Sequence, residues 1–303
     1  MVEATDGEAI AVLERARTRV DQRLDTLAGH IAGEVPGPLG AALAYALRSP
    51  GKRVRPALLL AAYEACGGRN AAADGLATAV EIVHTYSLVH DDLPCMDDDA
   101  LRRGRPTTHV EFDVTTATRV GYLLVPVAAE QLARAAVAME LDPATVGSLA
   151  RELFEAGGIR GMVGGQWLDL EAEGRQLDLS GLTAVHRGKT GALITAAVVI
   201  GGIAAGATDT TLAALRAFGS EIGLAFQVAD DVLDATGSSR VLGKTAGKDA
   251  VVAKSTYVGL LGVERARAEA ARHCAAAIEL LTAAAVAPGA LVPLARYIVT
   301  RSS

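Results

Sequence analysis

Residues 81–104 read EIVHTYSLVHDDLPCMDDDALRRG, a nearly apolar helical stretch that runs into a cluster of acids. His84 and Asp91 are seven residues apart, which is two helical turns, so we expect them on one face of a helix. Five carboxylates then fall within nine positions and repel one another unless a cation lies between them. Mg²⁺ is the natural cation, because it binds through one or two carboxylates together with substrate phosphate.

A solvated helix end and an EF-hand loop both fit this acidic cluster less well than a magnesium site. A solvated helix end would suffice for two acids, but five at the end of an apolar helix are too many. An EF-hand loop that starts at Asp91 would need Gly and Glu where the chain has Met96 and Arg102. The segment therefore predicts a helix that ends near Pro94 and carries a metal-binding cluster at its end.

A second acidic cluster lies in GLAFQVADDVLD, residues 223–234. Gln227, Asp230, Asp231 and Asp234 stand at positions i, i+3, i+4 and i+7, so they share one helical stripe. Like charges at this spacing destabilise a helix unless a cation bridges them. This pattern predicts a second metal-binding site.

Around these clusters the chain predicts one all-α domain over residues 1–303. Half of the 303 residues are hydrophobic, and aromatic residues make up only 4%, a balance that favours helices over strands. We find no alternation typical of strands and no linker that would divide the chain. The predicted helical stretches are 8–30, 39–47, 58–68, 77–93, 114–140, 143–162, 181–187, 190–206, 210–235, 254–284 and 289–300.

Charge and cysteine content narrow the class of protein. The net charge of -6 argues against a nucleic-acid partner. Cys66, Cys95 and Cys274 are scattered, which is typical of reduced cytosolic thiols. The apolar segment 191–207 is interpreted as a buried helix rather than a transmembrane segment, and the N-terminus lacks the apolar core of a signal peptide. We therefore expect a cytoplasmic protein.

Basic residues near helix breaks are candidates for binding an anion. They occur in GKRVRP (51–56), HRGKTG (186–191) and LGKTAGKDAVVAKSTY (242–257). The Gly243-Lys244-Thr245 triplet is not part of a P-loop, because Ser238 occupies the position of the required first glycine.

Taken together, these motifs resemble the trans-isoprenyl diphosphate synthases, particularly the bacterial farnesyl diphosphate synthases. The resemblance covers nearly the whole chain, including GMVGGQWLDLEAEG between the two acidic motifs. It implies a bundle of long helices around a central cavity and a homodimer. It also implies a Mg²⁺-dependent prenyltransferase that condenses isopentenyl diphosphate with allylic diphosphates, here most simply to farnesyl diphosphate.

Site residues carried over by position fall into three groups. The resemblance implies catalytic or metal-binding roles for Asp91, Asp92, Asp97, Asp230, Asp231 and Asp234. It implies isopentenyl diphosphate binding by Lys52, Arg55, His84 and Arg103, and binding of the allylic diphosphate by Arg102, Lys189, Thr190, Gln227 and Lys244. Lys254 is a further candidate for substrate binding, and Lys189 for catalysis.

Product length depends on where the growing chain is stopped. Tyr86 lies five residues before Asp91, about 7.5 Å along the helix axis, and is predicted to form the floor of the cavity beside Ser87. Many family members carry Asp where this chain has Tyr122, so the shape of the pocket and the choice between C15 and C20 stay open.

Two other classes of protein fit the motifs less well. A terpene cyclase is disfavoured because its second acidic motif carries Asn, Ser and Glu, whereas this chain has Asp-Asp-x-x-Asp at 230–234. A non-catalytic partner subunit is disfavoured because both acidic motifs are present.

Overall fold

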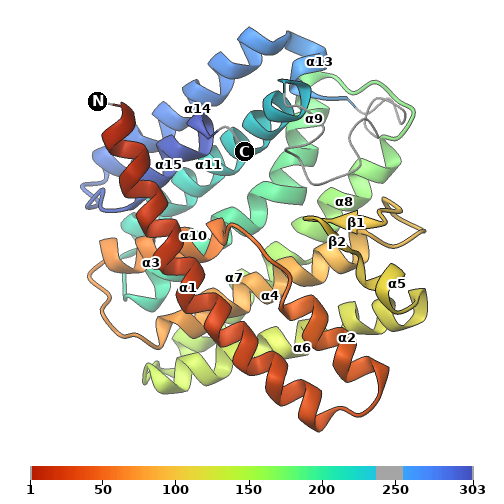
Figure 1. Cartoon of the computed structure of the whole chain (residues 1–303). Helices are drawn as coiled ribbons and strands as arrows, with labels where there is room; N and C mark the ends of the chain where they lie inside the picture. Colours follow the sequence, from red (N-terminus) through yellow and green to blue (C-terminus); the bar gives the residue numbers. More distant parts are fainter. Residues whose placement is uncertain (1, 237–254, 302–303) are drawn as a thin grey trace.

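The computed structural model describes residues 2–236 and 255–301 of the chain. These residues form the predicted all-helical bundle (Figure 1). The longer helices are α1 (Val2–Glu34), α4 (Ala73–Asp91), α6 (Val114–Ala138), α7 (Pro143–Gly157), α10 (Ala192–Ala204), α11 (Asp209–Thr236) and α14 (Val263–Ala283). The shorter ones are α2 (Pro38–Leu47), α3 (Val54–Ala65), α5 (Thr108–Glu111), α8 (Met162–Glu171), α9 (Leu179–His186), α13 (Tyr257–Leu261) and α15 (Leu291–Thr300).

The first two helices pack as an antiparallel pair. α2 runs back along α1 after a turn at Gly37, whose φ of 75° lies in the left-handed region that glycine adopts without strain (Figure 1). Pro38 then begins α2, a position where its missing N–H costs nothing.

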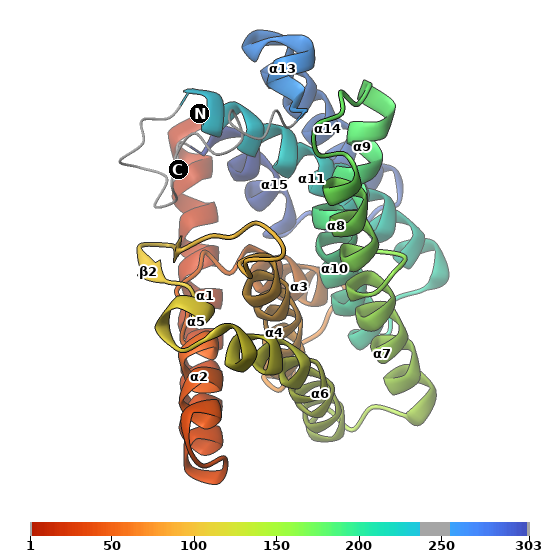
Figure 2. The same cartoon turned by 90° about the vertical axis from the view of Figure 1, so that its right-hand side faces the viewer.

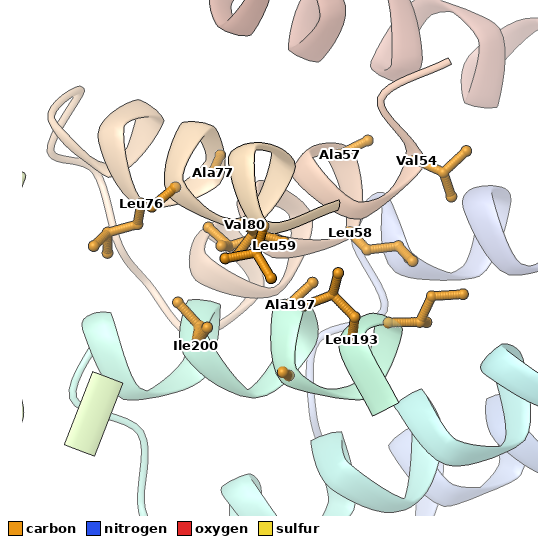
Figure 3. Close-up of a cluster of buried hydrophobic side chains, with 14 of the residues drawn as sticks. Val54, Ala57, Leu58, Leu59, Leu76, Ala77, Val80, Leu193, Ala197 and Ile200 are labelled. Carbon is orange, nitrogen blue, oxygen red and sulfur yellow. The ribbon is translucent and has the colours of Figure 1, made fainter. Parts of the chain in front are cut away.

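The core lies where α3 and α4 meet α10. Figure 3 shows side chains of α3 and α4, among them Leu58, Leu59 and Val80, facing Leu193 and Ile200 of α10. All five are at most 1% exposed. α10 (Ala192–Ala204) covers most of the apolar segment 191–207, so the interpretation of that segment as a buried helix is confirmed. This packing fixes the helix that leads to the first acidic cluster.

Several boundaries differ from the sequence prediction. The sequence has no alternation typical of strands, yet a short hairpin follows the first acidic cluster, where β1 (Leu101–Arg102) pairs antiparallel with β2 (Arg105–Pro106). The single helix 254–284 is wrong, because Gly262, with φ 79°, separates α13 from α14. α8 was missed, and a π-helix, η1 (Arg187–Gly191), joins α9 to α10 in one continuous run.

The two ends of the described chain lie close together. α15 packs against α1, and Thr300 donates a hydrogen bond to Asp6 at 3.2 Å. The thiols of Cys66, Cys95 and Cys274 are all free. α6 and α11 reach the length and apolar content of a membrane-crossing helix, but α11 carries the second acidic cluster within the bundle.

Candidate active site

The GKRVRP segment is organised by a buried arginine. Arg53 has φ 52° and precedes α3, and its side chain is 3% exposed. Its guanidinium donates to Glu81 of α4 at 2.6 Å, to Asp21 of α1 at 2.7 Å and to the Ser49 carbonyl at 2.7 Å. Burial lowers the pKa of Arg53, but the two carboxylates outweigh it and the net shift is upward. Arg53 therefore ties the loop to two other helices.

The neighbouring cations Lys52 and Arg55 lack such partners among the described residues and form a cationic cluster with Arg103. Burial is the main cause that lowers the pKa of Arg55 to about 10; Glu81 opposes the shift and Arg103 adds to it. Lys52 also has a lowered pKa, first from burial and then from the nearby charge of Arg301. The buried Nε of Arg55 has no hydrogen-bond partner within the part of the chain that the structure describes. A buried, unsatisfied guanidinium N–H beside other cations is suited to an anion.

His84 lies in the same electrostatic environment. Burial lowers its pKa well below the usual value, and the charges of Arg55 and Arg103 lower it further. The imidazole is therefore neutral at pH 7 and can donate or accept a hydrogen bond. The four residues predicted to bind isopentenyl diphosphate are thus brought together from the loop before α3 (Lys52), α3 (Arg55), α4 (His84) and the β1–β2 turn (Arg103).

The first acidic cluster surrounds the end of α4. Asp91 is the last residue of that helix, and burial raises its pKa to about 6. The charge of Lys189 opposes this rise, whereas Asp97 and Asp92 add to it. A mostly buried carboxylate with acidic neighbours is stabilised by a bound cation.

Among the described residues, Asp92, unlike Asp91, is paired with an arginine. It is 4% exposed and accepts a hydrogen bond from Arg102 Nε at 2.6 Å. Arg102 belongs to β1 and also contacts Asp99 at 3.5 Å. The missed β-hairpin thus brings an arginine back onto the acidic cluster, and this arginine is the predicted ligand of the allylic diphosphate.

The π-helix η1 presents two further predicted site residues. Lys189 Nζ contacts Asp169 of α8 at 2.7 Å, and Thr190 Oγ1 donates to Gln227 Oε1 of α11 at 2.8 Å. Gly165 allows α8 to approach η1 closely, because a Cβ at this position would lie 2.0 Å from the backbone nitrogen of Lys189. π-helical turns occur frequently at functional sites, and this one brings α8 and α11 to the same place.

The adjacent acids of the second cluster have different partners. Asp231 is 9% exposed and accepts a hydrogen bond from the backbone N–H of Tyr257 at 2.8 Å. His186 approaches the same carboxylate at 3.6 Å. Asp231 therefore joins α11 to α13 and α9, a structural contact that the sequence prediction did not include.

Asp230 contacts an arginine that sequence reasoning missed. The guanidinium of Arg301, at the end of α15, is paired with Asp230 and is only 2% exposed. It also lies 4.1 Å from the centroid of the Phe226 ring and donates to the Ile298 carbonyl at 2.6 Å. A single arginine near the C-terminus gives no sequence signal, because its partner is 71 residues away.

Gln166 on α8 was not assigned a role either, although it lies in the Gly-Gly-Gln element. It is 6% exposed, and both polar atoms of its amide lack hydrogen-bond partners among the residues described. Its buried amide next to the glycine that contacts Lys189 makes it a candidate substrate ligand.

The remaining predicted residues occupy varied positions. Tyr86 is half-buried on α4, where burial raises its pKa, and Ser87 donates to the His84 carbonyl at 2.9 Å. Asp234 is exposed near the end of α11. Lys244 and Lys254 lie outside the described residues. A groove of about 830 Å³ between α7, α10 and α11 is lined by none of the predicted site residues.

The residues present are chemically suited to Mg²⁺. The donors are carboxylate oxygens, and the raised pKa of Asp91 reflects a buried negative charge that a cation would stabilise. Within residues 2–236 and 255–301, no three His, Cys, Asp or Glu side chains form a ready-made metal site.

Comparisons with known proteins agree on the family of this chain. The polyprenyl synthetase family profile matches residues 37–286. A farnesyl diphosphate synthase of Escherichia coli is 43% identical over 272 residues, covering 88% of this chain and 90% of that protein. The large subunit of a heterodimeric geranylgeranyl pyrophosphate synthase of Arabidopsis thaliana is 46% identical over 229 residues, covering 75% of this chain but only 62% of the plant protein.

Solved structures agree with the sequence comparison. A geranyltransferase of Helicobacter pylori, crystallised with magnesium and isoprenyl diphosphate, superposes with a TM-score of 0.79 at 34% identity, covering 96% of this chain and 95% of its own. The predicted fold class and the family resemblance are confirmed. The chain therefore belongs to the polyprenyl synthetase family and is a prenyltransferase of the short-chain trans-prenyl diphosphate synthase type.

Proposed function

We propose that this enzyme condenses isopentenyl diphosphate with dimethylallyl and then geranyl diphosphate, head to tail, and releases diphosphate at each step. The observation that carries this proposal is the pairing of a cationic cluster with two acidic motifs in one site. The unsatisfied guanidinium of Arg55, beside Lys52 and Arg103, suits one diphosphate. Lys189 lies within electrostatic range of Asp91 and suits a second one.

Two separate groups of residues bind the two substrates. Lys52, Arg55, Arg103 and neutral His84 bind the diphosphate of isopentenyl diphosphate. Arg102, Lys189, Thr190 and Gln227 orient the allylic diphosphate, and Lys244 and Lys254 are candidates to complete the site. The allylic C–O bond breaks, the double bond of isopentenyl diphosphate attacks the allylic carbon, and the proton is lost to the departing diphosphate. Exclusion of water from the closed site would protect the cation from being quenched.

We propose that Mg²⁺ is held by Asp91, Asp97 and Asp230, with Asp92, Asp231 and Asp234 in support. Bound there, Mg²⁺ would neutralise the charge that develops on the departing diphosphate. Exposure supports this division, since the Asp230 side chain is 37% exposed although it pairs with Arg301, whereas Asp92 and Asp231 are 5% and 8% exposed.

We favour farnesyl diphosphate as the main product. The half-buried Tyr86, one to two turns before Asp91, supports a short cavity. Geranylgeranyl diphosphate is the alternative, since relatives of similar identity carry either name. The test is incubation of the purified chain with isopentenyl and dimethylallyl diphosphates and Mg²⁺, followed by extraction and sizing of the products. Absence of any product would favour a non-catalytic partner subunit instead.

We further propose one domain over residues 1–303, a homodimer and a cytoplasmic location. The dimer follows from the family resemblance, and exposed apolar side chains on α6 and α8 are available to an interface. They include Tyr122, Leu123, Val137, Val163, Trp167 and Leu168. Light scattering would decide the oligomeric state.

A further inference from the structure

Three aromatic rings connect the predicted cavity floor to the outer surface of α6. Tyr86 packs edge-to-face on His90, one turn further along α4, with ring centroids 5.2 Å apart and an interplanar angle of 74°. His90 packs edge-to-face on Tyr122 of α6, at 5.5 Å and 88°. Tyr86 is half-buried, whereas Tyr122 is 66% exposed. We propose that Tyr122 is a positioning residue for product length, which holds His90 in place so that His90 supports Tyr86.

His90 is wedged against the backbone of α6, which runs beside α4 (Figure 2). Its Nε2 lies 3.1 Å from the carbonyl oxygen of Thr118. Because a carbonyl oxygen can only accept, Nε2 carries the proton, and the hydrogen bond anchors Nε2 while the ring can still tilt about that bond. Gly121 makes this approach possible, since a Cβ there would lie 1.9 Å from Nε2. The imidazole therefore cannot move toward α6.

The two tyrosines hold the remaining sides of the imidazole. Tyr122 follows Gly121 directly and contacts the imidazole on its solvent-facing side. Tyr86, one turn earlier on α4, contacts the imidazole on the side of the bundle interior. Without the Tyr122 ring, His90 can tilt outward and Tyr86 loses its support. The rings of α4 and α6 therefore act as one unit, and a surface residue influences the depth of the cavity. This inference rests on the proposed function, because it assumes that Tyr86 stops the growing chain.

Substitutions at position 122 test the role of the ring. Tyr122→Ala and Tyr122→Gln remove the ring, and Tyr122→Phe keeps it. The measured quantity is the ratio of the next longer product to the main product, with total isopentenyl incorporation, melting temperature and oligomeric state recorded for each variant. The strength of an edge-to-face pair corresponds to a rise of about threefold to tenfold in this ratio for the Ala and Gln variants. The Phe variant keeps the wild-type ratio.

Two comparisons separate this role from a general disturbance of α6. Val137→Ala changes another exposed apolar residue of α6, 78% exposed and about 22 Å further along the helix than Tyr122, and should leave the ratio unchanged. The double variant Tyr86→Ala/Tyr122→Ala should give the same ratio as Tyr86→Ala alone, because Tyr122 acts through Tyr86.

The outcomes distinguish the inference from the function on which it rests. If the wild type makes prenyl diphosphates but the Ala and Gln variants keep its ratio, Tyr122 has no positioning role. Equal shifts in the Phe or Val137→Ala variants, or additive shifts in the double variant, also overturn the inference. If the wild type makes no prenyl diphosphate under any condition, the proposed function itself fails.

Discussion

Removal of the Glu81 carboxylate is the most direct test of how the basic loop is held. Glu81 and Arg53 are each 3% exposed at the side chain and meet at 2.6 Å. Breaking a buried pair from one side typically costs 3–5 kcal/mol, because the other charge stays buried. Arg53 would keep Asp21, whose side chain is 43% exposed, so the lower end applies. We expect Glu81→Ala to lower the free energy of unfolding by about 3 kcal/mol.

The measurement is equilibrium unfolding in urea, followed by far-ultraviolet circular dichroism. The matched control is Asp25→Ala, which breaks the Arg48–Asp25 pair. That pair has the same distance of 2.6 Å, but its side chains are 45% and 70% exposed. Exposed pairs contribute at most about 1 kcal/mol, so the control should change the unfolding free energy little. A loss in Glu81→Ala no larger than in Asp25→Ala would refute the reasoning.

The same variant has a functional consequence. Arg53 lies between Lys52 and Arg55, so a disturbed Arg53 displaces both cations. We expect the apparent KM for isopentenyl diphosphate to rise in Glu81→Ala, with a smaller effect on the allylic substrate. Asp25→Ala should leave both KM values unchanged.

Three further predictions concern the chemistry of the site. Chelation of Mg²⁺ should abolish turnover, and Asp91→Ala or Asp230→Ala should each lower kcat/KM by at least ~10³-fold, about 4 kcal/mol of barrier; full activity in chelator would exclude the metal mechanism. Arg55→Ala should raise the KM for isopentenyl diphosphate about tenfold, and Lys189→Ala that for the allylic diphosphate, because each loses a charge-assisted hydrogen bond; steady-state kinetics showing the reverse pattern would contradict the assignment. Tyr86→Ala should shift products toward C20 or longer with condensation retained, and an unchanged distribution by reverse-phase sizing would show that Tyr86 is not the floor.

Helices were predictable where one face is buried, because the apolar period then reports that face directly. In α1, within the predicted helical stretch 8–30, Leu13, Val20 and Leu24 recur at helical spacing and are at most 8% exposed. Ile10 fits the same period but is 43% exposed. The β1–β2 hairpin was not predictable, because two-residue strands joined by backbone hydrogen bonds leave no periodic pattern. The break at Gly262 was missed because a single glycine can also occur inside a helix.

The acidic clusters were predictable because repulsion among several carboxylates is visible in the sequence itself. The partners of those carboxylates were not. Asp230 and Asp231 are adjacent and identical, yet one contacts Arg301 and the other the backbone of Tyr257. Only the fold decides which residue of a distant helix reaches each carboxylate.

For the cations of the GKRVRP segment, too, the fold decides which side chain has a protein partner. From charge and spacing alone, Lys52, Arg53 and Arg55 are equivalent candidates for binding an anion, and only the family resemblance singles out Lys52 and Arg55. In the fold, Glu81 and Asp21 occupy the guanidinium of Arg53, whereas the Nε of Arg55 keeps an unsatisfied donor among the residues described. A paired arginine stabilises the loop, and an unpaired one in a buried cationic cluster is available to a ligand. The carboxylate of one helix thus determines which arginine of another is structural and which is left for substrate.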